Sequence, residues 1–181
     1  MRLVGLVGAA LAVVAPWLGW LLVVDGHVVP GWGLGVGLLV VALVLLWIPR
    51  PAVDKTPGAR LAVRRRVRAV GTALAVISVG LAAGADALYE AKYQVLSPGA
   101  SDGCRVVVRE TSALKLGTGD AYVVRGLGLG QRTATWVADD GYRPVRAGTY
   151  DLALGPDGGT LTVRGTASDP VMPGTHPIDC G

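Results

Sequence analysis

The sequence predicts a membrane protein of mixed class, with three transmembrane helices followed by a small antiparallel β-sandwich or barrel domain outside the membrane. Two observations predict this class. Three long apolar runs lie within residues 1–88, and from residue 104 onward the pattern changes to short β-branched or alternating segments separated by turn residues. A third observation, a cluster of basic residues between the second and third apolar runs, sets the orientation.

The first predicted span covers residues 3–24, which contain no charged residue. A helix of this length measures about 33 Å, enough for a hydrocarbon core of about 30 Å. The alternative is a cleaved signal peptide in which Arg2 is the basic n-region. The run is too long for a signal peptide and ends in Trp17, Gly19 and Trp20 without a small-x-small cleavage motif. The sequence therefore favours an uncleaved span.

The second and third predicted spans cover residues 31–48 and 67–88. Trp32 and Trp47 lie near the two ends of the second span, as is typical of residues at membrane interfaces. Asp86 lies in the last turn of the third span, where we expect its side chain to reach the interface. Four small residues of the third span form pairs at four-residue spacing, which favours close helix packing but is also common in any Ala/Gly-rich segment: Gly71, Ala75, Gly80 and Gly84.

The basic cluster lies between these two spans, and only Asp54 offsets it. It consists of Arg50, Lys55, Arg60, Arg64, Arg65, Arg66 and Arg68. The positive-inside rule places the predicted loop of residues 49–66 in the cytoplasm, together with the N-terminus, and places everything after residue 88 outside. The same side chains are also suited to holding anionic lipid headgroups, and the sequence is compatible with both roles. The sequence thus predicts a multi-pass protein of the cell membrane.

Residues 89–181 are nearly neutral, with nine Lys/Arg and ten Asp/Glu, so no nucleic-acid partner is expected. Residues 89–103 are predicted to form a juxtamembrane linker, in which residues 89–93 continue the third helix. Residues 104–181 are predicted to form the extracytoplasmic β domain. The predicted strands are residues 105–110, 113–116, 121–125, 133–138, 149–154 and 161–164. The predicted core comprises Val106, Val108, Leu114, Leu116, Val123, Trp136, Val137, Tyr150, Leu152, Leu154, Leu161 and Val163.

Cys104 and Cys180 are the two cysteines of the chain, and both fall in the predicted extracytoplasmic domain. Disulfides persist on that side of a membrane, so we expect the two residues to be bonded. Such a bond would tie together the two ends of a domain that is small for a β fold. The alternatives are two free thiols or a redox pair, but a redox pair favours closely spaced cysteines.

No catalytic, cofactor or metal site is predicted. The glycine runs at residues 33–37 and 126–130 lack the spacing of a dinucleotide fingerprint, and the serines lack a nucleophile-elbow context. His27 and His176 are not grouped with enough ligands for zinc, and His176 is expected to be exposed in a Pro-rich tail. The expected function is the presentation of the β domain for binding or assembly with a protein partner of unknown identity. The alternative is an accessory subunit that packs in the membrane against a transporter or other membrane complex.

Overall fold

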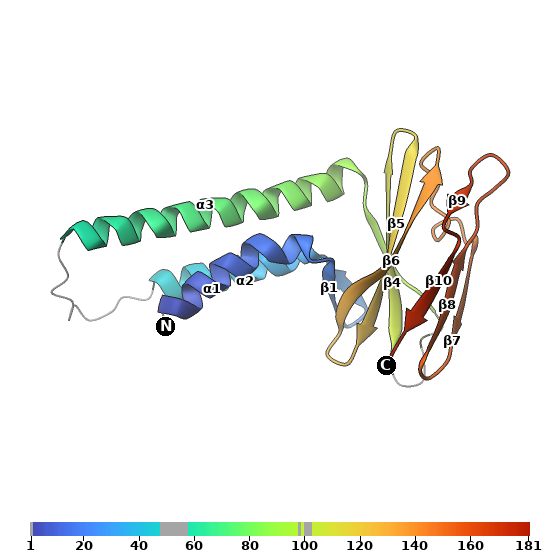
Figure 1. The fold of residues 1–181 in the computed structure, drawn as a ribbon, viewed down its shortest axis with the longest axis horizontal. Coiled ribbons are helices and arrows are strands. Elements are labelled where there is room, and N and C mark those ends of the chain that lie inside the picture. The colour runs from blue at the N-terminus through green and yellow to red at the C-terminus, as the bar shows by residue number, and fades with distance from the viewer. Residues whose placement is uncertain (1, 48–57, 98, 100–102) are drawn as a thin grey trace. The chain divides into compact units, whose positions relative to one another are not determined.

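A computed structural model describes residues 2–47, 58–97, 99 and 103–181 (Figure 1). The chain divides into two compact units, and each is made of two separate segments. Met1–Leu18 and Gly31–Ala83 form the first, which we call the helical unit, and Gly19–Pro30 and Gly84–Gly181 form the second, the β unit. The predicted combination of helices with antiparallel sheet is confirmed.

The helical unit contains α1 (Arg2–Val14), the 3₁₀ turn η1 (Ala15–Trp17), α2 (Gly31–Trp47) and most of α3 (Gly58–Leu88). The residues buried between these helices are mainly small, and they include Ala12, Ala15, Ala42, Ala75 and Val79. The Trp17 indole Nε1 donates a hydrogen bond to the Ser78 hydroxyl at 2.8 Å, and that hydroxyl donates to the Val13 carbonyl at 2.6 Å. Close backbone approach therefore joins α1 to α2, and side-chain hydrogen bonds join α1 and η1 to α3.

The prediction of a continuous helix over residues 3–24 is wrong. α1 ends at Val14, and Trp20–Val24 form strand β1, which turns at Asp25 and Gly26 into β2 (His27–Val29). Both turn residues have positive φ, 49° and 79°, as a two-residue hairpin turn requires. Leu21 and Val23 of β1 are buried in an apolar cluster of the β unit, so these two side chains are removed from water without a lipid environment, whereas Trp20 and Val24 are exposed.

The structure does not support three membrane-spanning helices. α1 is about 20 Å long and α2 about 26 Å, both shorter than the hydrocarbon core of about 30 Å. Among the described residues, one helical stretch is both long and apolar enough to cross a membrane, Ala69–Leu88 of α3.

The predicted basic loop is wrong over residues 58–66, because α3 begins at Gly58. The residues that follow, Ala, Arg, Leu, Ala and Val, are mostly good helix formers, and nothing in their sequence breaks a helix. Five of the basic residues thus lie in the first part of α3: Arg60, Arg64, Arg65, Arg66 and Arg68. Arg50 and Lys55 lie outside the described residues.

The β unit is built from two antiparallel sheets within the described part of the chain. Sheet A has the order β2-β1-β6-β5-β4-β3, and β9 also pairs with β6. Sheet B has the order β10-β8-β7. The strands not yet defined are β3 (Lys92–Val95), β4 (Arg105–Ala113), β5 (Leu116–Arg125), β6 (Leu129–Asp139), β7 (Tyr150–Leu154), β8 (Gly158–Val163), β9 (Val171–Met172) and β10 (Thr175–Asp179).

One apolar core lies between the two sheets and gives the unit a barrel-like arrangement. Sheet A contributes Val106, Val108, Ala121, Val123 and Trp136, and sheet B contributes Leu161, Val163 and Ile178. Of the predicted core, Val106, Val108, Val123, Trp136, Leu161 and Val163 are confirmed as buried, while Tyr150, Leu152 and Leu154 are partly buried against the core.

Three predicted core residues, Leu114, Leu116 and Val137, are instead exposed. The prediction of a strand at residues 113–116 is wrong, because β4 turns into β5 there and Leu114 has a φ of 53°. Residues 117–120, which lie between two predicted strands, are also strand, since β5 begins at Leu116. Val137 lies on the other face of β6 from the buried Trp136, as the alternation of side chains in a strand requires.

The predicted linker is also shorter than expected. Residues 89–93 do not continue the helix, because α3 ends at Leu88 and Glu90 has a φ of 47°. β3 then pairs with β4 along its whole length, with Lys92 opposite Glu110 and Val95 opposite Val107. The segment predicted to be a linker therefore contains a strand of sheet A.

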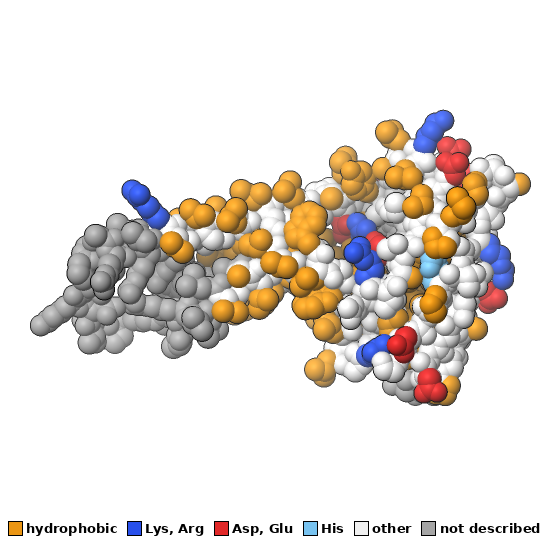
Figure 2. All heavy atoms as spheres, in the orientation of Figure 1, with side chains coloured by type: hydrophobic (Ala, Val, Ile, Leu, Met, Phe, Trp, Pro, Cys, Tyr) orange, Lys and Arg blue, Asp and Glu red, His pale blue; other side chains and the backbone are white. Residues whose placement is uncertain are grey.

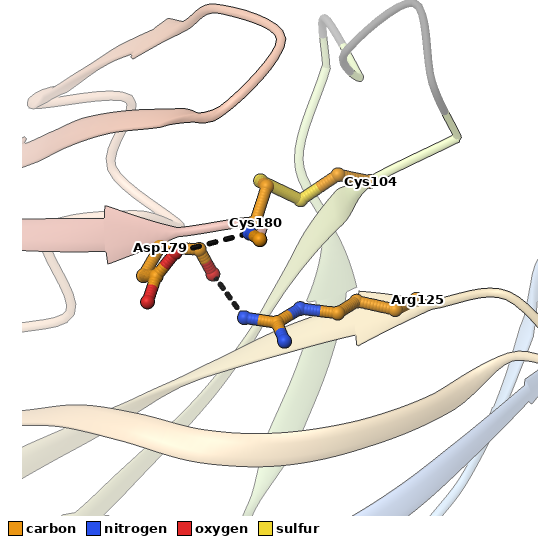
Figure 3. Close-up of a disulfide and its surroundings, with 5 residues drawn as sticks. Cys104, Arg125, Asp179 and Cys180 are labelled. Carbon is orange, nitrogen blue, oxygen red and sulfur yellow. Dashed lines mark hydrogen bonds between the residues drawn. A yellow bond between two sulfur atoms is a disulfide. The ribbon is translucent and has the colours of Figure 1, made fainter.

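The predicted disulfide between Cys104 and Cys180 is confirmed, with the two Cα atoms 6.0 Å apart (Figure 3). Cys104 directly precedes β4 of sheet A, and Cys180 directly follows β10 of sheet B. Beside the disulfide, the Arg125 guanidinium donates a hydrogen bond to the Asp179 carbonyl at 2.6 Å. These two links fasten the last strand of the chain to sheet A.

Candidate functional site

The densest group of charges in the β unit lies on the face of sheet A that points away from the core. Arg109 in β4 stands opposite Tyr93 in β3 on one side and Asp120 in β5 on the other. Their neighbours in sequence, such as Val108 and Ala121, point into the core, so strand alternation places these three side chains on the outer face. Together with Asp86 and Arg132 we call them the charged row.

Arg109 is the centre of the charged row. Its Nη2 and Nε donate to Asp86 Oδ1 at 2.6 and 3.1 Å, and its Nη1 donates to Asp120 Oδ2 at 3.0 Å. The Tyr93 hydroxyl donates a hydrogen bond to the other oxygen of Asp86, Oδ2, at 2.7 Å. Arg132 Nη1 lies 3.5 Å from the other oxygen of Asp120. Each carboxylate of the row therefore faces at least one guanidinium.

The charged row is suited to holding the end of α3 against sheet A. Burial, followed by the hydrogen bond to Asp86, raises the pKa of Tyr93 far above its usual range, so its hydroxyl remains a donor. The two carboxylates and two guanidiniums balance in charge, and the side chains of Arg109, Asp86 and Asp120 are less than one-fifth exposed. Because Asp86 belongs to the last turn of α3, the row fastens the end of this helix to sheet A.

A second polar group lines a shallow cleft of about 400 Å³ beside the turn that follows β6. The cleft residues are Glu90, Ser112, Gly141, Tyr142, Arg143, Arg146 and Ala147. Arg143 Nη2 donates to the Glu90 carbonyl at 3.0 Å and lies 3.4 Å from its carboxylate. The cleft therefore combines two guanidiniums with an exposed carboxylate.

Buried Glu110 holds the loop that carries both arginines of this cleft. Its Oε1 and Oε2 accept hydrogen bonds from the backbone N–H groups of Val145 and Arg146 at 2.8 and 2.9 Å. Burial raises the pKa of Glu110, and the two hydrogen bonds act in the opposite direction. Glu110 thus ties β4 to the loop between β6 and β7.

A buried aromatic pair joins the two sheets. The Trp136 ring of β6 and the His176 ring of β10 have centroids 5.5 Å apart. The prediction of an exposed His176 is wrong: it is 4% exposed, and burial lowers its pKa. Neither Trp136 Nε1 nor His176 Nε2 has a hydrogen-bond partner in the described structure. A Cβ at Gly119 would overlap the indole, so the absence of a side chain there makes room for the ring.

Apart from the two bonded cysteines, the predicted residues whose side chains the structure describes do not gather at a common site. Arg66 is exposed, and Ala75 is buried in the helical unit, whereas a Cβ at Gly71, Gly80 or Gly84 would meet no described atom within 4 Å. The described residues contain no group of three or more His, Cys, Asp or Glu side chains suited to a metal ion.

The charged row was not predicted, although the sequence contains a signal for it. Arg109 and Asp120 interrupt apolar strands at positions that alternate with core residues, a pattern that reads equally well as solvent-facing. Only the strand register brings the two side chains together. No protein-family model matches the chain, and comparisons with curated proteins and with solved structures give no significant match.

Proposed function

We propose that this chain is an integral membrane protein that holds a disulfide-tied β unit on the extracytoplasmic side for binding or assembly. In this proposal α3 crosses the bilayer, and α1 and α2 lie in the bilayer beside it. The observation that carries the proposal is the surface of the helical unit.

That surface is apolar over its described side chains (Figure 2). The exposed residues include Val7 and Leu11 of α1, Val40 and Val44 of α2, and Ile77 of α3. In the helical unit, Arg66 is the one charged residue whose side chain the structure describes. Contiguous apolar surface of this extent is costly in water, whereas lipid tails solvate it.

The connections between the units support one orientation. The β1–β2 hairpin leaves the helical unit after Leu18 and returns at Gly31, and it pairs with β6 of sheet A. α3 leads into β3 of the same sheet. Residues 20–30 and 84–181 therefore share one side of the membrane, and the basic start of α3 lies at the other end of the proposed crossing. The positive-inside rule assigns that basic end to the cytoplasm.

The anchoring role of the charged row supports a presenting function. Asp86 at the end of α3 is bonded to Arg109 and Tyr93 of the sheet, so the crossing helix ends in the β unit itself. The disulfide between Cys104 and Cys180 suits an extracytoplasmic compartment, where such bonds persist.

Extraction and topology experiments test the proposal. After expression in a bacterium, the chain should stay with the membrane pellet in alkaline carbonate and be released by detergent. A protease added to spheroplasts should digest a tag placed after Gly181 and spare one placed before Met1. Release by carbonate would refute membrane integration, and the opposite protection pattern would refute the orientation.

The alternative function, an accessory subunit in a membrane complex, is favoured by one observation. Gly80 and Gly84 are exposed, and a Cβ at either position would meet no described atom within 4 Å. This strip of α3 therefore packs against no other described part of the chain. Gly80→Leu and Gly84→Leu should abolish co-purification of a membrane partner if this alternative holds. Leu81→Ala on the neighbouring exposed surface serves as the control.

A further inference from the structure

An exposed apolar patch lies at the end of sheet A where β4 turns into β5. The patch consists of Leu114, Leu116, Val137 and Met172, and we call it the lipid-facing patch. We propose that it contacts the headgroup region of the membrane that α3 crosses. The inference rests on the proposed membrane location and adds a second attachment of the β unit to the bilayer.

All four side chains of the patch are exposed to solvent. Leu114 is 101% exposed at the turn, Met172 is 72% exposed, and Leu116 and Val137 are about half exposed. Val137 pairs with Met172, so the two side chains lie together on one face. Figure 2 shows apolar side chains gathered at the end of the β unit that holds the β4–β5 hairpin.

The patch shares a face with the charged row. Leu116 and Asp120 lie four residues apart on β5 and point to the same side, about 13 Å apart along the strand. Val137 pairs with Thr118, which lies between them on that face. Because Asp120 and Arg109 belong to the row that holds Asp86, the patch lies on the face of the β unit that carries the end of α3.

The end of α3 also approaches the hairpin through the backbone. The Ser112 N–H donates to the Tyr89 carbonyl at 2.9 Å, and Ser112 pairs with Gly117 just before the turn. Leu88 and Tyr89, at the end of the proposed crossing, are themselves exposed, so they add apolar and aromatic side chains to this part of the β unit. Tyrosine at this position is typical of a membrane interface.

The chemistry of the patch fits a lipid surface better than a second protein. A stable protein interface buries roughly 800 Å² on each partner, more than four side chains supply. Lys115 stands at the turn between Leu114 and Leu116, where its ammonium can meet anionic headgroups. Asp139, opposite Leu116, and Asp140 add negative charge at the same end, which limits the contact to the interface rather than the hydrocarbon.

Fluorescence quenching by brominated lipids tests the inference on the full chain. Leu114→Trp and Met172→Trp place an indole in the patch. Ala153→Trp places one on the face of sheet B that points away from the core, where Ala153 is exposed. Each variant is reconstituted in phosphatidylcholine–phosphatidylglycerol vesicles with lipids brominated near the headgroup, and the wild-type emission is subtracted.

We expect the added emission of Leu114→Trp and Met172→Trp to fall at least twofold in brominated vesicles and that of Ala153→Trp to stay unchanged. Two patch variants are used because Leu114 occupies a positive-φ turn and Met172 does not. Equal quenching of all three variants, or quenching of neither patch variant, would overturn the inference. So would emission of the patch variants that depends on protein concentration and not on bromination, the sign of a second copy.

The emission of the native tryptophans distinguishes a failure of the patch inference from a failure of the membrane proposal. Trp17 and Trp32 belong to the helical unit, and their emission should be quenched by lipids brominated deeper along the chain. Quenching of wild-type protein with unquenched patch variants refutes the patch alone. Unquenched wild-type protein refutes both proposals.

Discussion

Replacing Arg109 by Met should destabilise the β unit by about 2–4 kcal/mol. The variant keeps the apolar stem of the side chain but removes every hydrogen bond that Arg109 donates to Asp86 and Asp120. Removing one partner of a buried ion pair costs roughly 3–5 kcal/mol, because the remaining charge stays buried without compensation. Arg109 is 19% exposed and water reaches part of the site, so we reduce the expected cost to about 2–4 kcal/mol.

Arg132→Met is the matched control. Arg132 faces the same Asp120, but its side chain is 47% exposed and its contact of 3.5 Å is longer. An exposed ion pair contributes about 0–1 kcal/mol, so this variant should unfold nearly like the wild type.

The measurement is a urea titration of the full chain in detergent micelles, with the β-sheet signal followed by far-ultraviolet circular dichroism. Equal slopes for wild type and variants would show that the midpoints report stability. If Arg109→Met and Arg132→Met shift the midpoint equally, the charged row is not what stabilises the β unit, and its role as an anchor is refuted.

Three further changes can be read from the same titration. Replacing Cys104 and Cys180 by Ser should cost at most about 4–5 kcal/mol, the chain entropy of the closed loop, and an unchanged midpoint would refute a stabilising disulfide. Glu110→Ala leaves two backbone N–H groups without acceptors and should cost about 2–4 kcal/mol, with Asp151→Ala, at an exposed site, as the control. Burial lowers the pKa of His176 below its ordinary 6.5, so the unfolded chain takes up the proton first, and wild-type stability should fall as the pH drops through 6.5 toward the folded pKa. His176→Phe should lack that part of the pH dependence, and identical pH profiles would contradict the assignment.

The sequence predicted the composition of the fold because its main signals are local. Ala/Gly/Leu-rich runs form α2 and α3, and the alternation around Val106, Val108, Val123 and Leu161 marks the core strands correctly. The disulfide was predictable because two cysteines in one predicted domain leave a single pairing. Each of these inferences needs only residues that are close in sequence, or the number of cysteines in the chain.

The β1–β2 hairpin shows where local reasoning fails. Its apolar residues prolong the run of α1, so hydropathy alone extends the helix through them. Asp25-Gly26, flanked by apolar residues on both sides, is a strong hairpin signal, but its use depends on partner strand β6, more than a hundred positions later. The pairing of Leu22 with Leu129 cannot be read from either segment alone.

The charged row could not be predicted from the sequence, for a related reason. The sequence separates Asp86 from Arg109 by a helix end, a strand and the segment between them, and no periodicity connects the two residues. Their 2.6 Å contact depends on the turn after Leu88 and on the register of β3 against β4. Leu114 and Val137 leave the predicted core for other reasons, because Leu114 lies in the β4–β5 turn and Val137 alternates with the buried Trp136 along β6.

The place of β1 in sheet A also imposes an order on biogenesis. At a synthesis rate of roughly 5–20 residues per second, β1 emerges about 5–20 s before its partner β6. During that interval Leu21 and Val23 have no sheet to cover them, while α2 and α3 are already being synthesised. Once β6 arrives, pairing with β1 joins the first and last thirds of the chain, and the helices can no longer change their orientation without breaking the sheet. Under the proposed membrane location, sheet completion is the step that fixes the arrangement of the chain.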